Sequence, residues 1–201
     1  MNVDTIEQLR ALYGYPSGRA KIKSLSQLEQ HSKNFISKSP FVVISTVDKN
    51  YKLDASPRGG ATGFIKVIDD KTIIIPDAKG NNRLDSLSNI IATKQIGLLF
   101  MIPGVDETLR LNGKAHLSTD DVYLNLFVEE RKRPTSCIVV NIEELFLHCA
   151  KAFMRSKIWD VSAQIDRKEL PTLGKMLNDQ LHIDAPTESQ EEMVARYQKD
   201  L

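Results

Sequence analysis

Between Phe41 and Asp77 the chain carries a series of short β-branched runs, and this change from the helical spacing before it restricts the fold more than any other feature. Apolar and β-branched residues recur at short spacing between turn formers such as "DKN", a pattern typical of strands in hairpins. The four runs are "FVVISTV", "YKLDASP", "GFIKVID" and "KTIIIPD". Because tight connections favour pairing between consecutive strands, we predict an antiparallel meander here.

A helix and further strands follow this region. In "NRLDSLSNIIATK" the apolar residues have helical spacing, and "STDDVYLNLFVEERK" predicts another helix that begins with a capping box, Ser118 with Asp121. The later strand candidates are "IGLLFMIP", "TLRLNGKAHL", "TSCIVVNI" and "EELFLHCA". The chain thus has roughly six to eight strands, mostly antiparallel, which close most simply as a barrel. The predicted fold is mainly β: an antiparallel β-barrel with peripheral helices.

The two ends of the chain are predicted to be helical. Residues 1–40 form an N-terminal helical segment, residues 41–160 the barrel domain, and residues 161–201 a C-terminal helical tail packed on the barrel. Capping-box patterns, Ser24 with Gln27 and Thr187 with Gln190, predict the first turns of two of these helices.

Charge and composition exclude several classes of function. Lys and Arg number 27 and Asp and Glu 26, whereas a nucleic-acid-binding protein usually carries a basic excess. No apolar run approaches the roughly 20 residues of a membrane span, and the first residues do not resemble a signal peptide. Cys137 and Cys149 lie in apolar contexts that indicate buried free thiols, so we expect a cytoplasmic protein. No cluster has metal-ligand spacing, and we predict no metal.

Hydrogen-bond donors are concentrated where a strand leads into a helix, at Lys79, Gly80, Asn81, Asn82 and Arg83. A helix that begins near Asn82 would point its free N–H groups and its dipole at this loop, which favours a bound anion. Gly80 would permit a left-handed turn, and Arg83 could bind a phosphate through two parallel bonds. A well-capped surface helix with solvated basic residues explains the segment equally well.

A second candidate feature is "LDASPRGGATG", which ends a strand with Arg58 and two glycines. Pro57 stiffens the chain, and Gly59 and Gly60 remove side-chain bulk beside the arginine, as a flat ligand against the backbone would require. The alternative is a β-bulge with an exposed arginine, which is common.

The third feature is "HCAKAFMRSKIWD", residues 148–160. On a helix, Lys151, Arg155 and Trp159 fall four apart on one face and could hold an anionic or aromatic ligand. Taken alone, the segment is better explained as an amphipathic helix with a solvated basic face and a core tryptophan.

Together, "SPRGG", "GNNRLDSL", "LRLNGKA" and "HCAKAFMRSKIW" resemble, in this order, the pyridoxamine 5′-phosphate oxidase-like superfamily. The resemblance implies a split β-barrel that binds FMN, usually as a homodimer with shared flavin sites. The apolar runs "IGLLFMIP" and "CIVVNI" fit this assembly, because a barrel interior buries one strand face and a partner subunit could bury the other. The oxidase's Arg-x-His element is replaced by "MRSKIW", so the resemblance is to a subgroup of flavin enzymes and not to the vitamin B6 oxidase itself.

The resemblance also implies which residues bind the cofactor. Ser56, Pro57, Arg58 and Gly59 would contact the flavin ring and ribityl chain. Asn82 and Arg83 would bind the phosphate, with Lys79, Asn81 and Ser86 as further candidates. Lys151, Arg155 and Trp159 would approach the flavin of the same or the neighbouring subunit.

The function that follows is an FMN-dependent oxidoreductase that transfers a hydride between the flavin and a small molecule. The alternative is a non-catalytic flavin-binding module, a sensor or reservoir, or a relative that binds a tetrapyrrole or a deazaflavin. The sequence identifies no catalytic acid or base, although His116, His148 and His182 are available.

Overall fold

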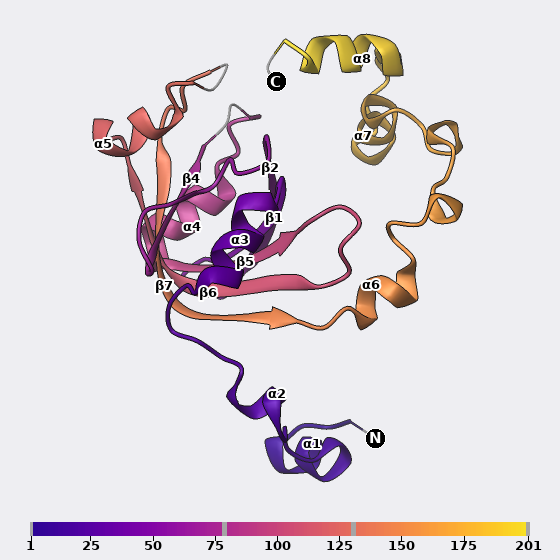
Figure 1. Ribbon diagram of the computed structural model, residues 1–201. Helices are drawn as coiled ribbons and strands as arrows, with labels where there is room; N and C mark the ends of the chain where they lie inside the picture. Colours follow the sequence, from indigo (N-terminus) through magenta and orange to yellow (C-terminus); the bar gives the residue numbers. More distant parts are fainter. Residues whose placement is uncertain (1, 78–79, 130–131, 200–201) are drawn as a thin grey trace.

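A computed structural model describes residues 2–77, 80–129 and 132–199. Its centre is a seven-stranded, wholly antiparallel sheet in the order β2-β1-β5-β6-β7-β4-β3 (Figure 1). The sheet curls into an open, split barrel, which confirms the predicted fold class. The strands are β1 (Phe41–Val47), β2 (Leu53–Gly59), β3 (Lys66–Val67), β4 (Thr72–Pro76), β5 (Gln95–Met101), β6 (Thr108–Ser118) and β7 (Cys137–His148).

The predicted four-strand meander is wrong, because β2 and β3 lie at opposite edges of the sheet. They belong to two separate hairpins, β1–β2 and β3–β4, which are joined through β5, β6 and β7. The chain between the hairpins inserts Phe64 and Ile65 into the core, where they are 5% and 3% exposed. This long-range burial, which local spacing does not encode, separates the two hairpins.

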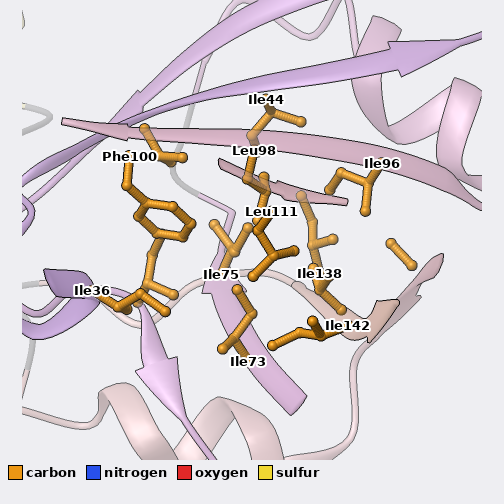
Figure 2. Close-up of a cluster of buried hydrophobic side chains, with 14 of the residues drawn as sticks. Ile36, Ile44, Ile73, Ile75, Ile96, Leu98, Phe100, Leu111, Ile138 and Ile142 are labelled. Carbon is orange, nitrogen blue, oxygen red and sulfur yellow. The ribbon is translucent and has the colours of Figure 1, made fainter. Parts of the chain in front are cut away.

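The main core lies between the strands and is closed by α3 (Gln30–Lys38) and α4 (Asp85–Thr93). Figure 2 shows Ile44, Leu98, Phe100 and Leu111 pointing into it, with Ile36 of α3 beneath Phe100. Each such fully buried side chain contributes roughly 1.5–3 kcal/mol relative to an exposed one.

A second, smaller cluster lies on the other face of β4 and β7. Cys137 and Val139 pack there against Leu124 of α5 (Asp121–Leu124) and Phe127 of the short helix η1 (Asn125–Phe127). The second face of "CIVV" is therefore buried by the same chain and needs no partner subunit. The helix predicted from Ser118 is only this short pair, and Asp120 caps it.

The two strand candidates "TSCIVVNI" and "EELFLHCA" form one long strand, β7. It contains a β-bulge: Gly113 pairs with Ile142 and Asn112 with Glu144, which leaves Glu143 as the extra residue. A Cβ on Gly113 would lie 2.1 Å from the Asn141 carbonyl oxygen, so the bulge requires glycine at this position.

At the N-terminus, α1 (Ile6–Tyr13) and α2 (Arg19–Ile22) precede α3. The capping box predicted at Ser24 is wrong: α3 begins at Gln30, and the Glu29 carboxylate accepts the N–H groups of His31 and Ser32, both at 2.7 Å. Leu25 is instead extended, because its backbone pairs with Leu145 of β7.

The C-terminal residues form α6 (Lys151–Ser156), the single turns η2 (Val161–Ala163) and η3 (Arg167–Glu169), α7 (Leu173–Leu181) and α8 (Gln190–Tyr197). Ser189 with Glu192, and not Thr187 with Gln190, makes the capping box of α8. We expected this tail to pack on the barrel, but it curves away from the sheet (Figure 1), and none of the described residues from 161 to 199 is buried. Leu173, Leu177 and Leu181 remain 43%, 45% and 63% exposed along α7.

The cysteines differ from one another. Cys137 is buried and Cys149 is exposed, so the prediction of two buried thiols is wrong for Cys149, which follows the last residue of β7. Among the described residues, no helix is both long enough and apolar enough to span a membrane.

Candidate functional site

Three segments that are distant in sequence meet along β2. The Ser86 hydroxyl, in the first turn of α4, donates to the Asp54 carboxylate of β2 at 2.6 Å. From the end of β4, Asp77 lies close enough to Arg58 of β2 for the guanidinium to influence its titration. Burial raises the pKa of Asp77, and the positive charge of Arg58 only partly offsets this effect. The strand "DASPRG" and the loop before α4, two of the predicted ligand-binding features, are therefore neighbours in the fold.

The β2 residues alternate between the two faces of the strand. Ser56 and Arg58 are half-buried and pair with Ile44 and Val42, whereas Pro57 and Gly59 are exposed on the opposite face. The Arg58 guanidinium donates to the Pro57 carbonyl at 2.9 Å. The four predicted residues consequently present two surfaces and not one continuous contact face.

The two glycines after Arg58 have different roles. A Cβ on Gly60 would lie 2.8 Å from the Phe64 Cβ, so Gly60 is required for core packing. A Cβ on Gly59 would lie 3.5 Å from the Pro40 carbonyl oxygen, an ordinary contact. Nothing in the described chain demands the absence of a side chain at Gly59.

The loop before α4 differs from its predicted geometry. The helix begins at Asp85 and not near Asn82, and its N-cap is Leu84, which has no side-chain acceptor. Asn82 and Leu84 take the left-handed conformation, with φ of 61° and 59°. Leu84 is strained in this conformation, at a cost of roughly 1–3 kcal/mol that surrounding packing must offset. The first-turn N–H groups of α4 thus have no side-chain cap from Leu84. An anion site requires such uncapped N–H groups.

Charged groups surround this helix start. The Arg83 Nε donates to the Asp85 carboxylate at 2.7 Å, and this bond, reinforced by the charges of Asp85 and Asp54, raises the pKa of Arg83. The Arg83 side chain remains 75% exposed. The side-chain Oδ1 of Asn81 accepts the backbone N–H of Arg83 at 3.1 Å, and Asn82 is exposed. Lys79, the remaining predicted phosphate partner, lies outside the described residues.

The stripe predicted on the C-terminal helix does not form. Lys151 and Arg155 are exposed on α6, but Lys157 ends the helix in a left-handed conformation, with φ of 51°. Trp159 therefore lies beyond the helix, where its Nε1–H donates to the Val105 carbonyl at 3.0 Å. The centroid of its ring lies 5.6 Å from the centroid of the Phe153 ring. These contacts hold α6 against the β5–β6 connection.

Lys151 and Arg155 are exposed on α6. Among the described residues, neither has a hydrogen bond, ion pair or ring contact with the candidate residues of β2 or of the loop before α4. The structure brings Ser56, Arg83 and Ser86 together around the Asp54 carboxylate. Arg58 lies two residues beyond Ser56 on the same face of β2.

Two grooves of the surface are lined by other residues. One, of about 490 Å³, runs between α3 and β3 past Lys33, Ile65 and Lys66. The other, of about 440 Å³, lies at the C-terminal end of α4 beside Lys94, Lys114 and His116. Neither is lined by a predicted site residue. In a single chain the candidate site is an open surface and not an enclosed pocket, since Gly59, Asn82 and Arg83 are all exposed.

Sequence reasoning missed two carboxylates of this site, Asp54 and Asp77. A signal for Asp54 was present, because residues 54, 56 and 58 of a strand lie on one face. Asp77 could not be placed beside Arg58 from the sequence, since their proximity depends on how the sheet curls.

Comparison with known proteins identifies the family. Residues 28–149 match the family described as pyridoxamine 5′-phosphate oxidase, and since this is more than half of the chain, the protein belongs to that family. Membership supports flavin binding and confirms the resemblance seen in the sequence. None of the curated proteins compared with the chain matches it.

The chain is similar to several solved structures. HupZ of Group A Streptococcus superposes with a TM-score of 0.51 at 18% identity, covering 60% of this chain and 93% of HupZ. An FMN-binding protein from Syntrophomonas wolfei gives 0.42 at 14% identity, over 58% of this chain and 87% of that one. General stress protein 26 from Bacillus anthracis gives 0.42 at 16% identity, over 59% and 94%. The family match leaves residues 1–27 and 150–201 outside it.

Proposed function

We propose that the protein binds FMN where β2 meets the start of α4, and that it is an FMN-dependent oxidoreductase acting on a small molecule. One observation carries the proposal: in a member of this family, Ser56 of β2, Ser86 of α4 and the charge of Arg83 meet around Asp54, and Arg58 follows on the same face of β2. The phosphate of FMN would replace Asp85 as the partner of Arg83, and would accept the first-turn N–H groups of α4. Asn82 and Asn81 are close enough in sequence to add amide donors, and we keep Lys79 as a further candidate.

The ring and ribityl chain would lie along the C-terminal half of β2. Ser56 and Arg58 present a hydroxyl and a guanidinium on the half-buried face, and both can bond to the polar atoms of a flavin. Pro57 and Gly59 lie on the opposite, exposed face, and Gly59 has no side chain there. We propose that the flavin ring also contacts Gly59, the last residue of β2, where the strand ends.

FMN, when bound, would supply the hydride chemistry. The chain's own contribution is to bind and orient the flavin and to leave its substrate face open to a small molecule. None of the predicted site residues that the structure describes near β2 is a histidine, cysteine or tyrosine. For this reason we keep a flavin-binding module without turnover as the second candidate function.

We further propose that the functional unit is a homodimer. The strand faces opposite the core carry Phe41 and Val43 on β1, Leu99 and Met101 on β5, and Leu53 on β2, which are aligned by the strand pairing. These side chains range from half-buried to 84% exposed, while α3 and α4 pack on the inner face. A second copy of the chain would bury this outer face, as well as apolar residues of the tail.

In such a dimer, Lys151 and Arg155 would serve the partner's flavin. Both side chains are exposed on α6 and make no contact with the described candidate residues of β2 or of the loop before α4, which supports this assignment. We assign Trp159 the task of holding α6 in place, since its indole N–H is already bonded to Val105.

The absorption spectrum of the purified protein tests the proposal most directly. A yellow protein whose flavin is reduced by a nicotinamide cofactor supports the oxidoreductase, and a yellow protein that resists reduction supports the binding module. A colourless protein that takes up neither FMN nor another flavin refutes both.

A further inference from the structure

Asp54 joins three elements at the candidate site through its carboxylate. Besides Ser86 of α4, it accepts the hydroxyl of Ser56 at 3.3 Å and that of Thr46 of β1 at 3.5 Å. The bond from Ser86, at 2.6 Å, is short and charge-assisted, whereas the other two lie near the limit for hydrogen bonds. Ser86 and Thr46 are 2% and 3% exposed, so Asp54 satisfies hydroxyls that water hardly reaches.

A row of polar residues on α4 faces the β1–β2 hairpin. Ser86, Asn89 and Thr93 are spaced by three and four residues, and therefore share one helix face. The Asn89 amide donates to the Thr46 hydroxyl at 3.0 Å, and the Thr93 hydroxyl donates to the Val47 carbonyl at 2.9 Å. The bond between Ser86 and Asp54 is the member of this row nearest to the start of the helix, and hence nearest to Arg83.

We propose that Asp54 is a positioning residue, which fixes the distance and angle between the β2 segment that faces the flavin ring and the helix start that faces the phosphate. The inference rests on the proposed function. It adds a residue that would contact neither the flavin ring nor the phosphate. Ser56, on the ring side, and Ser86, on the phosphate side, bond to the same carboxylate. A ligand that binds at both ends gains affinity only if the two halves of its site are held at the correct separation.

Because Asp54 is negatively charged, the direction in which Asp54→Asn changes FMN affinity tests its role. A carboxylate near a phosphate repels it, so if Asp54 acted only through its charge, Asp54→Asn would tighten FMN binding. If Asp54 positions the two halves, the same substitution weakens the bond to Ser86, loosens the helix start and lowers FMN affinity. Ser86→Ala removes the same bond but keeps the negative charge, and separates the two effects.

The experiment titrates FMN and riboflavin into the wild type, Asp54→Asn, Ser86→Ala and the double variant, with flavin fluorescence as the readout. Riboflavin lacks the phosphate and uses only the β2 half of the site. We expect each single variant to reduce the ratio of FMN to riboflavin affinity by roughly tenfold, the value of one charge-assisted bond. The double variant should lose little more than either single one, because both remove the same contact. Asp184→Asn, an exposed carboxylate of the tail, is the matched control and should leave the ratio unchanged.

Thermal unfolding of each apo variant shows that it is folded, and Ser86→Ala keeps the test valid if Asp54→Asn does not fold. If the wild type prefers FMN to riboflavin and the variants keep or increase this preference, the positioning role of Asp54 is overturned, but the phosphate site is not. A wild type that binds riboflavin as tightly as FMN removes the proposed phosphate site, and this inference with it.

Discussion

At the scale of single residues, Arg83 is the clearest candidate partner of the phosphate. Arg83→Ala should weaken FMN binding by roughly tenfold or more, because a charge-assisted hydrogen bond contributes about 1.5–3 kcal/mol, and should affect riboflavin much less. Isothermal titration of both ligands measures the difference. Arg133→Ala, which removes an exposed arginine paired with Asp121, is the matched control and should change neither affinity. Equal losses for FMN and riboflavin would remove Arg83 from the phosphate site.

The two glycines after Arg58 allow a paired test at the same scale. Gly59→Val should give a folded but colourless protein, because the chain itself has room for a Cβ at Gly59 and only a ligand would be displaced. Gly60→Val should instead lower the melting temperature, since its side chain would collide with Phe64. Circular dichroism and the visible spectrum record both outcomes. A yellow Gly59→Val protein with normal affinity would place the ring elsewhere.

At the scale of helices, side-chain caps can be tested through pH. Burial pushes the pKa of Glu29 upward, but hydrogen bonds from the N–H groups of His31 and Ser32 outweigh it and lower the pKa overall. A carboxyl whose folded-state pKa is lowered contributes stability above its unfolded pKa, and this stability is lost as pH falls through the folded value. Glu29→Ala should therefore cost roughly 1 kcal/mol near neutral pH and less at acid pH.

Urea unfolding of the wild type and Glu29→Ala at several pH values measures this difference. Glu29→Gln keeps one acceptor without the charge, so its difference from Glu29→Ala should not vary with pH. A wild-type advantage over Glu29→Ala that stays constant down to pH values below 4 would contradict the role of the ionised carboxylate.

Helix starts also show why part of the structure could be predicted and part could not. The sequence pattern located α4 and nearly all of the strands, because burial of one face leaves a periodic trace, and it predicted helices at both ends of the chain, where α1, α3, α7 and α8 lie. It misplaced the first turn of α3, since Ser24 donates its hydroxyl to Glu144 of β7 and Leu25 pairs with the same strand. The start of α4 was misplaced similarly: Asn82 resembles a cap, but two left-handed residues delay the helix to Asp85. Contacts with distant strands decided both cases.

The order of the strands and the grouping of the site show the same limit. The candidate residues on β2 and before α4 were predicted from local chemistry and from the family resemblance, since glycine, arginine and asparagine are informative where a strand or helix ends. Their contact through Asp54 and Ser86 depends on how α4 packs on the β1–β2 hairpin. This packing has no local signal in the sequence.

At the scale of the whole molecule, the distribution of apolar side chains favours an assembly. The core of the barrel is closed by its own helices, yet the outer face of β1, β2 and β5 and the apolar face of α7 remain uncovered. A helix of nine residues is marginal in water without tertiary packing, although Thr172 caps α7. The tail therefore requires a surface that its own barrel does not offer in this conformation, and a second copy of the chain would present one.

The proposed homodimer can be tested together with its shared site. Light scattering should give twice the mass of the chain. If the pair is obligate, we expect its interface to bury more than roughly 2,000 Å². Leu99→Glu, on the outer face of β5, should produce monomers and lower FMN affinity, whereas Val122→Glu, on an exposed position of α5, should do neither. FMN should raise the melting temperature of the wild type, because ligand that binds only the assembled state stabilises it by mass action. Arg155→Ala should weaken FMN without changing the mass. A stable monomer that binds FMN at full affinity would refute the shared site, and a dimer whose affinity ignores Arg155 would remove only that residue from it.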